Sequence, residues 1–232
     1  MTVWKDETFF RPEWQLGRAI HVIGCGSLGS LYGTSLARAG ATNLHLWDFD
    51  VVEAHNAHNQ QFFPAQVGMS KVEALAQIIA EIRPGEQVCS LHTERVTKDT
   101  VLSGIVLFGV DTWSARYEIN SHCLRENPDV SFVGDGRLGA SFGRVYGYDP
   151  NNARHMECLY TDDHLPSVPP PDPVEPVCAA TPPVIAMTNV IAGMVLWRLG
   201  RWLHFEQGCP DPYHNFMFLG FVPPMVEFQE WV

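Results

Sequence analysis

The chain is poor in positive charge. It has 15 lysines and arginines against 26 aspartates and glutamates, a formal net charge of −11 over 232 residues. Nucleic-acid binders are usually basic, so this balance argues against a nucleic-acid partner. It fits a soluble protein that could bind a basic partner. At 46% hydrophobic and 18% charged residues, the composition predicts one large globular domain rather than a disordered chain.

The sequence also lacks cysteine pairs, a signal peptide and a membrane-spanning run. No two of its six cysteines form a Cys-x-x-Cys pair, which predicts a reduced, cytoplasmic chain rather than a disulfide framework. The N-terminus, MTVWKDETFFRPEW, lacks the apolar core of a signal peptide. The apolar run at 184–199 is short and includes Thr188, Asn189 and Arg198, so it indicates a buried helix rather than a membrane span.

A glycine pattern near the N-terminus organises the rest of the chain. A short apolar run at 19–23 is followed by Gly24, Gly26 and Gly29 in a Gly-x-Gly-x-x-Gly spacing. Gly24 permits a tight turn, Gly26 lets the backbone approach a nucleotide, and Gly29 lets a helix pack close to the strand. The helix that follows would offer free N–H groups and partial positive charge to a phosphate.

An acidic residue follows the glycine pattern at the sequence separation typical of dinucleotide-binding folds. A helical pattern runs as far as Gly40, and a second apolar run at 44–47 ends in Asp48. Asp48 lies about 20 residues past the glycines, the spacing of a carboxylate that binds a ribose hydroxyl. Asp50 would point the same way on a continuing strand. The alternative is a turn that binds nothing, with Asp48 as a solvated strand end.

Polar residues then follow the second strand. Asn56, His58, Asn59 and Gln60 leave the same predicted sheet edge as the glycine turn. Ligands of open α/β sheets bind outside the carboxyl ends of the strands. The cluster therefore fits a ligand site, although a polar surface loop needs no function.

Lys71 occupies an unusual helical position. Ser70 and Glu73 form a capping box ahead of a helix predicted to end near Arg83, so Lys71 falls in its first turn. A lysine there opposes the helix dipole. This conflict favours a role in meeting an anion, and a solvated surface lysine is the alternative.

The next buried strand ends in a carboxylate. The apolar run at 104–110 predicts a parallel strand that leads into Asp111, a position suited to a magnesium ion. The alternative is that Asp111 caps the helix expected over 112–126.

The remaining elements complete an α/β fold. Further strands are expected at 87–92, at 130–133, around 142–148 with one exposed face, at 213–218 and at 225–228. A mobile proline-rich loop is expected at 165–176 and a long helix at about 183–203. The prediction is a Rossmann-like, mostly parallel sheet flanked by helices, with an antiparallel C-terminal extension.

Taken in order, these motifs resemble the ThiF/MoeB/HesA superfamily, the prokaryotic relatives of ubiquitin-activating enzymes. The resemblance runs from about residue 19 to 203. It rests on six segments: GCGSLG at 24–29, DFDVV at 48–52, the Asn…Gln cluster at 56–60, VGMSK at 67–71, GVDTWSAR at 109–116 and CAATPPVIAMTNVIAG at 178–193. No single segment is specific, and their order is what identifies the family.

The resemblance implies an activity and a set of site residues. Members of this family bind ATP and Mg2+ and adenylate the C-terminal carboxylate of a small ubiquitin-like or sulfur-carrier protein, commonly as homodimers. Carried over by position, the residues fall into four groups: the nucleotide loop (Gly24, Gly26, Gly29), the ribose carboxylates (Asp48, Asp50), the phosphate-side residues (Asn56, Gln60, Lys71) and the magnesium ligand (Asp111). We expect an N-terminal arm at 1–16 and one adenylation domain at 17–232, with its nucleotide-binding half at about 17–135 and its C-terminal half, containing the crossover loop, at about 136–232.

The sequence departs from the family pattern at several positions. Asn59 stands where the family usually has an arginine, and Arg11, Arg18 or Arg116 could compensate, for example across a dimer interface. Thr112 stands where asparagine is common. The family's structural zinc is not expected, because Cys158 and Cys209 are unpaired. A mixed site formed by these two cysteines with His155 and His214 is the alternative.

Cys178 and the overall activity leave alternatives open. By resemblance, Cys178 is a candidate for covalent thioester or persulfide chemistry, or else a small buried filler. Asn59 also suggests a catalytically weak nucleotide-binding module, the degenerate half of an activating pair. The glycine pattern alone would allow an NAD-dependent oxidoreductase, in which the Asn…Gln cluster and Lys71 have no obvious use.

Overall fold

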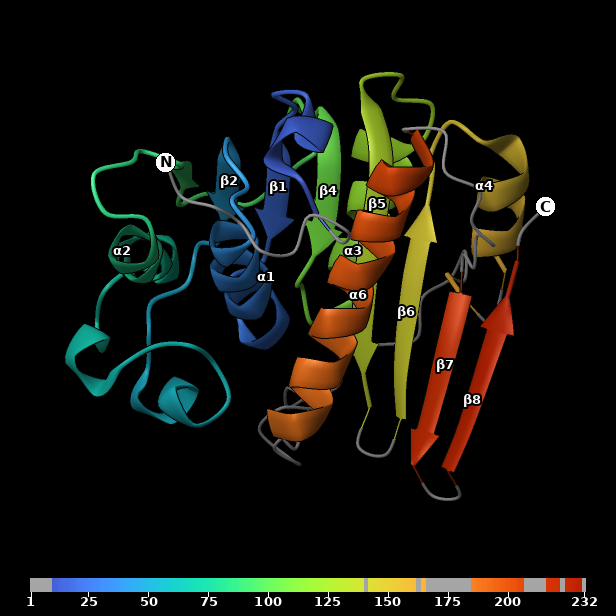
Figure 1. Cartoon of the computed structure of the whole chain (residues 1–232). Helices are drawn as coiled ribbons and strands as arrows, with labels where there is room; N and C mark the ends of the chain where they lie inside the picture. Colours follow the sequence, from blue (N-terminus) through green and yellow to red (C-terminus); the bar gives the residue numbers. More distant parts are fainter. Residues whose placement is uncertain are drawn as a thin grey trace.

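One eight-stranded sheet forms the centre of the protein (Figure 1). The computed structural model describes residues 10–139, 142–161, 164–165, 185–206, 216–221 and 224–230. The strands are β1 (Ile20–Ile23), β2 (Leu44–Trp47), β3 (Cys89–His92), β4 (Gly104–Phe108), β5 (Val130–Leu138), β6 (Phe142–Tyr148), β7 (Phe216–Phe221) and β8 (Pro224–Gln229). The α-helices are α1 (Ser27–Arg38), α2 (Lys71–Ile82), α3 (Trp113–Ile119), α4 (Ala153–Leu159) and α6 (Ile185–Glu206). Short 3₁₀ turns lie at Pro12–Gln15, Ala54–His58 and Pro64–Gln66, and a π-helical turn follows α3 at Asn120–Leu124.

The sheet is parallel on one side and antiparallel on the other. Its order is β3-β2-β1-β4-β5-β6-β7-β8. The strands from β3 to β5 pair in parallel, and β6 to β8 add to β5 in antiparallel. Helices α1, α2 and α3 lie between successive parallel strands in the sequence, as crossover connections require. The predicted Rossmann-like sheet with an antiparallel C-terminal extension is confirmed.

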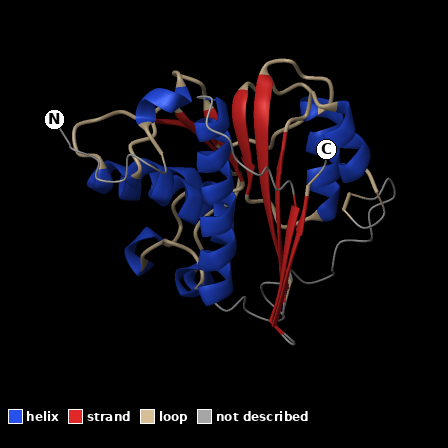
Figure 2. Cartoon of the chain, turned by 45° about the vertical axis from the view of Figure 1, so that its right-hand side comes forward, coloured by secondary structure: helices blue, strands red, loops and turns tan. Residues whose placement is uncertain are grey.

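Helices cover both faces of the sheet (Figure 2). α1, α2 and α6 contribute to one buried apolar cluster, and α3, the π-helical turn and α4 contribute to the other. β4 supplies both, with Ile105 and Leu107 in the first cluster and Val106 and Phe108 in the second. All residues of β4 are buried, which explains its continuous apolar sequence.

The nucleotide-binding half matches its predicted elements within a few residues. β2 spans the predicted run, and Gly40, with a φ of 89°, follows the end of α1 in the left-handed region. Ser70 caps α2 by accepting a hydrogen bond from the Glu73 backbone N–H, and Arg83 is the C-cap. Local capping and turn signals therefore determine where these elements begin and end.

Three predicted elements differ from the structure, and the first is β5, which runs to Leu138 although the strand is expected only over 130–133. β6 is more buried than the expected exposed-face strand, because α6 covers it on one side and the α3–α4 cluster on the other, with Val145 in the first and Tyr146 and Tyr148 in the second. The helix expected over 112–126 is α-helical only to Ile119, where it becomes a π-helical turn. There Asn120 donates to the Arg116 carbonyl at 2.9 Å and accepts from the Tyr148 hydroxyl.

Several expectations fall outside the described residues. Most of the proline-rich stretch, Cys178, Cys209 and His214 lie there, so the mobile loop and the mixed zinc site stay predictions. Four aromatic residues of the N-terminal arm are candidate anchors for it, and two of them, Trp4 and Phe9, also lie outside the described residues. The other two pack on the body of the protein: Phe10 is buried and Trp14 stacks on His204 of α6. Within the described ranges, none of the helices has the length and apolar character to cross a membrane.

The one polar residue of β1 is buried. His21 is 4% exposed and accepts a hydrogen bond from the Trp47 indole at 3.1 Å. Burial, with neighbouring His45 and His92, lowers the pKa of His21 to about 4, so the imidazole is neutral at pH 7. A satisfied, neutral histidine explains how a polar residue interrupts the apolar run of a central strand.

Candidate functional site

The glycine turn lies where β1 ends, against the end of β4. Gly24 has a φ of +86°, and its N–H donates to the Trp47 carbonyl at 2.8 Å. A Cβ on Gly29 would lie 1.7 Å from the Gly24 carbonyl oxygen, so α1 packs on the turn without room for a side chain. A Cβ on Gly26 would have no atom within 4 Å. Two of the glycines thus serve packing, and Gly26 borders open space at the start of α1.

These environments predict opposite results for two alanine substitutions. Gly29→Ala forces its methyl group into backbone and should destabilise the fold by about 1–3 kcal/mol or more. Gly26→Ala should leave the melting temperature unchanged, because its methyl group has room, yet weaken stabilisation by ATP if a nucleotide occupies that space. Thermal unfolding of both variants with and without ATP–magnesium measures this. Equal ATP stabilisation of Gly26→Ala and wild type would contradict a nucleotide at the turn.

Gly109 completes the turn and was not identified as a site residue. Its Cβ position would lie 2.3 Å from the Gly24 carbonyl oxygen, so the end of β4, like α1, packs on the turn without room for a side chain. Its N–H donates to the Ile23 carbonyl at 2.7 Å. A glycine directly after a buried strand and two residues before Asp111 is the signal that marks this close approach.

Asp48 is held against the glycine turn. One carboxylate oxygen accepts from the Cys25 backbone N–H at 2.7 Å, and the other accepts from the Asp50 backbone N–H at 2.8 Å. The residue is 8% exposed, and burial raises its pKa despite the opposing effects of Lys71 and the two N–H donors. Asp48 is therefore not a solvated strand end. The chain turns at this point instead of continuing as a strand.

Lys71 brings a buried cation to the carboxyl end of β2. Its ammonium group lies 2.9 Å from an Asp50 carboxylate oxygen, and the residue is 9% exposed. Burial alone would lower the pKa of Lys71, but the nearby carboxylates of Asp48, Asp50 and Asp111 raise it overall. Lys71 is therefore a buried cation at neutral pH, paired with Asp50 and further stabilised by the charges of Asp48 and Asp111. It is not the solvated surface lysine of the alternative interpretation.

Backbone pairing fixes Lys71 at this position. Val51 and Ser70 form an antiparallel bridge, and the Lys71 N–H donates to the Asp50 carbonyl at 2.9 Å. The segment after β2 thus folds back on the start of α2. Two segments about 20 residues apart in sequence meet at the carboxyl edge of the sheet, as the family pattern implies.

The Asn…Gln cluster lies in and after a 3₁₀ turn. Asn56 is 4% exposed, and its side-chain oxygen accepts from the Glu53 N–H at 2.9 Å, which leaves its amide N–H groups to donate. The side-chain oxygens of Asn59 and Gln60 are buried and have no hydrogen-bond partner among the described residues. Buried acceptors without donors are rare in proteins, so this cluster calls for a donor or water from outside it.

Two of the arginines proposed to compensate for Asn59 are engaged elsewhere. Arg18 precedes β1, at the opposite end of that strand from the glycine turn, and pairs with Glu206 at 2.8 Å. Arg116 is buried on Asp135 at 3.1 Å. Arg18 therefore cannot replace the missing arginine within one chain, because the length of β1 separates it from the glycine turn. Arg11 lies over the Trp14 ring, 5.5 Å from its centroid.

Asp111 is exposed just beyond β4, and it does not cap α3. Thr112 is the N-cap and accepts from the Ala115 N–H at 3.4 Å, so the alternative role for Asp111 is wrong. Within the described ranges, no three histidine, cysteine, aspartate or glutamate side chains gather as a metal cage. Magnesium needs no such cage when one carboxylate, the nucleotide phosphates and water hold it, so Asp111 fits that ion.

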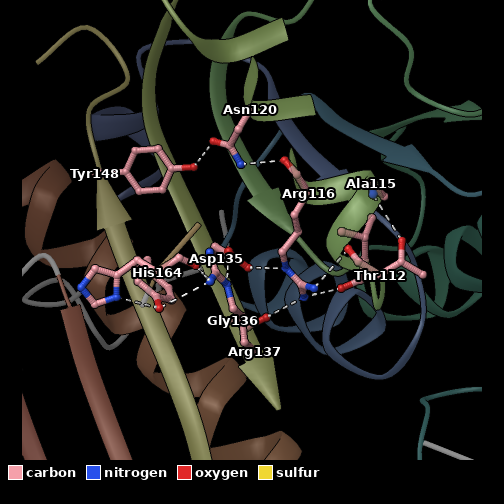
Figure 3. A network of polar contacts seen from close by, with 11 residues as sticks. Thr112, Ala115, Arg116, Asn120, Asp135, Gly136, Arg137, Tyr148 and His164 are labelled. Atoms are coloured by element: carbon pink, nitrogen blue, oxygen red, sulfur yellow. Dashed lines mark hydrogen bonds and ion pairs between the residues drawn. The ribbon is translucent and has the colours of Figure 1, made fainter. Parts of the chain in front are cut away.

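A buried charged cluster adjoins this site and was missed from the sequence (Figure 3). Asp135, on β5, is fully buried between Arg116 and Arg137, at 3.1 and 2.7 Å. Arg116 also donates to the carbonyls of Val110 and Gly136. The Asp135–Gly136–Arg137 stretch carries alternating charge on a strand that was expected to end at Val133. Charged residues are usually exposed, so the sequence does not predict that Asp135 and Arg137 are buried.

The comparisons with known proteins agree with this architecture. A family model described as "ThiF family" matches residues 17–224. Ubiquitin-like modifier-activating enzyme 5 of Drosophila grimshawi is 35% identical over 128 residues, 47% of this chain and 32% of the relative. The enzyme of that name from Caenorhabditis elegans is 31% identical over 158 residues, 61% of this chain and 37% of the relative. The chain thus spans about a third of the length of these curated relatives.

Solved structures of E. coli MccB share the fold. MccB with ATP aligns with a TM-score of 0.70 at 15% identity, covering 95% of this chain and 65% of that one. MccB with MccA-N7isoASN aligns with a TM-score of 0.72 at 16% identity, covering 95% of this chain and 66% of that one. At this identity the likeness concerns the fold alone.

Proposed function

The chain belongs to the ThiF family, and from this membership we propose that it adenylates the C-terminal carboxylate of a small protein or peptide with ATP. Pyrophosphate leaves, and an acyl-adenylate remains. Similarity to enzymes named for activating ubiquitin-like modifiers supports a ubiquitin-like substrate, and a sulfur-carrier protein is the other substrate of this class.

One observation carries this proposal: a buried cation at the carboxyl end of β2, ion-paired with the Asp50 carboxylate. Lys71 forms an ion pair with Asp50, and the charges of Asp48, Asp50 and Asp111 raise its pKa despite burial. A carboxylate that attacks a phosphate meets like charge, so a fixed cation is what this reaction needs. An enzyme transferring hydride to a nicotinamide has no comparable need for Lys71.

The remaining site residues have roles that follow from their positions. We assign the phosphates to Gly26, the start of α1, Lys71 and the amide groups of Asn56 and Gln60. Asp48 is assigned to the ribose, because one of its oxygens already bonds the glycine turn that would border the nucleotide. Asp50 positions Lys71 through their 2.9 Å ion pair.

Asp111 is assigned to magnesium. When bound, the ion would neutralise phosphate charge and orient the attacked phosphorus for the incoming carboxylate. This assignment predicts that ATP–magnesium stabilises the protein. A ligand at about 100 times its dissociation constant adds about 2.7 kcal/mol, which corresponds to a melting shift of about 5–10 °C for a chain of this size.

Thermal unfolding with ATP–magnesium and with NAD tests the proposal. Asp111→Ala should reduce the shift given by ATP–magnesium, and Asp99→Asn, an exposed acid away from the site, should not. The matching activity assay is ATP–pyrophosphate exchange in the presence of the substrate. Stabilisation by NAD alone would overturn the adenylation proposal.

The wider assignments rest on the family. We propose that residues 17–232 act as one adenylation domain preceded by the arm at 1–16, that the protein is a homodimer, and that it acts in the cytoplasm. Covalent chemistry at Cys178 belongs to the same set of proposals. Size-exclusion chromatography with light scattering tests the homodimer, and Cys178→Ala tests the covalent step.

Asn59 favours a second candidate, a catalytically weak nucleotide-binding module. Its buried, unpartnered oxygen stands where the family usually supplies a cation. ATP binding without pyrophosphate exchange, measured with the true substrate present, would favour this alternative over the adenylating enzyme.

A further inference from the structure

Among the residues that the structure describes, the buried cluster of Arg116, Asp135 and Arg137 carries one more positive charge than negative charge. Asp135 is 0% exposed, and the side chains of Arg116 and Arg137 are 7% and 6% exposed. Both guanidinium groups pair with this single carboxylate, and neither pairs with another acid in the described part of the chain. A buried charge is costly unless it is paired, so this excess predicts an anion that the described residues do not supply.

The excess charge is localised on Arg137. Its Nε donates to Asp135 at 2.7 Å, and its Nη1 donates to the His164 carbonyl and to the Tyr146 hydroxyl at 3.4 Å. The rings of Tyr146 and Trp113 lie near the guanidinium carbon, with centroids at 4.1 and 4.9 Å. Nη2 is buried and has no acceptor among the described residues. Nε and Nη1 of Arg137 therefore have acceptors, whereas Nη2 can still donate to a further acceptor.

Arg137 lies close to the proposed reaction site. Residue 135 pairs with Phe108, the last residue of β4, so Arg137 extends beyond the end of that strand. It contacts Trp113, two residues after Asp111, and shares Asp135 with Arg116, which donates to the Val110 carbonyl. Arg144 lies opposite Arg137 on β6 and adds positive charge to the same region.

We propose that Arg137 binds a carboxylate of the substrate tail and so selects an anionic tail for the adenylation site. This proposal rests on the proposed function. A guanidinium suits this ligand, because N–H groups on a fixed plane donate strong, charge-assisted hydrogen bonds to carboxylate oxygens. The carboxylate comes either from the terminal residue that reacts or from an acidic side chain near it.

Three synthetic peptides distinguish these sources. They are acetyl-Ala-Gly-Gly with a free carboxylate, the same peptide as its C-terminal amide, and acetyl-Glu-Gly-Gly-amide. Binding is measured by NMR titration of the full chain as wild type, Arg137→Gln, Arg137→Lys and the control Arg154→Gln, which removes an exposed arginine of α4. Loss of a hydrogen bond to a charged group lowers affinity by about tenfold to a hundredfold.

The expected result is that Arg137→Gln weakens binding of one carboxylate peptide at least about tenfold and leaves the neutral amide unchanged. Arg137→Lys should restore part of the affinity, because it keeps the charge but not the planar donors. Dependence of the free-carboxylate peptide on Arg137 identifies the terminal carboxylate, and dependence of the glutamate peptide identifies a side chain. Equal affinities in wild type and Arg137→Gln, or no preference for a carboxylate, would overturn the proposal.

ATP–magnesium stabilisation of the same variants separates this proposal from the proposed function. Arg137→Gln should keep the wild-type ATP shift, because no ATP role is assigned to this residue. A wild-type protein that ignores ATP contradicts adenylation, whereas an intact ATP response with unchanged peptide binding contradicts the role of Arg137 alone. The melting temperature without ligand confirms that each variant is folded.

Discussion

Replacing Lys71 with methionine is expected to slow ATP–pyrophosphate exchange by at least about a hundredfold, the loss typical of removing one fixed electrostatic donor from an active site. Methionine has a similar length and removes the charge. We assign to the buried Lys71 ammonium, which pairs with Asp50, the role of offsetting repulsion between the attacking carboxylate and the phosphate. Because burial has already removed water around Lys71, solvent cannot replace its charge.

Stability should change far less than activity. The Asp50 side chain is 50% exposed, so its ion pair with Lys71 is screened and contributes about 0–1 kcal/mol. Without Lys71, the pKa of Asp48, which burial already raises, should rise further. Lys98→Met, at an exposed position, is the matched control. Exchange rates within a factor of about three between Lys71→Met and Lys98→Met would remove Lys71 from the mechanism.

The sequence predicts the sheet because its core residues have few alternatives. An uninterrupted apolar run such as 104–108 must be buried on both faces, and helix ends follow from Ser70 and Gly40 through local capping. These signals act over a few residues. The extra length of β5 does not follow from them, because its second half is stabilised by pairing with β6 and by ion pairs with a distant helix.

The residues of the candidate site also divide into those that the sequence predicts and those that depend on tertiary packing. Strand order places Gly26, Asp48 and Asp111 at one edge of the sheet, because the carboxyl ends of parallel strands share an edge. The bridge between Val51 and Ser70 then brings Lys71 to Asp50. Gly109 and Asp135 depend on close approach and burial between elements that lie apart in the sequence. Their roles appear only when the backbone of β4 and β5 is in place.

Asp135→Asn is expected to destabilise the protein by about 3–5 kcal/mol, the cost of leaving a buried charge without its partner. Asparagine keeps the shape of aspartate but removes the one acid that Arg116 and Arg137 share. The melting temperature should fall by about 6–20 °C. Asp129→Asn, at an exposed acid just before β5, removes the same charge from the surface and should cost less than about 0.5 kcal/mol.

Combining this substitution with Arg137→Gln shows whether charge is the cause. In the wild type, Arg137→Gln removes the excess positive charge and leaves Asp135 with Arg116 as a balanced pair. In Asp135→Asn, two guanidinium groups face each other without an acid, so removing Arg137 should recover part of the lost stability. We expect the free energies of unfolding of the double-mutant cycle to depart from additivity by about 1 kcal/mol or more. Additive losses, or a cost for Asp135→Asn below about 1 kcal/mol, would mean that Asp135 is not the charge on which this cluster depends.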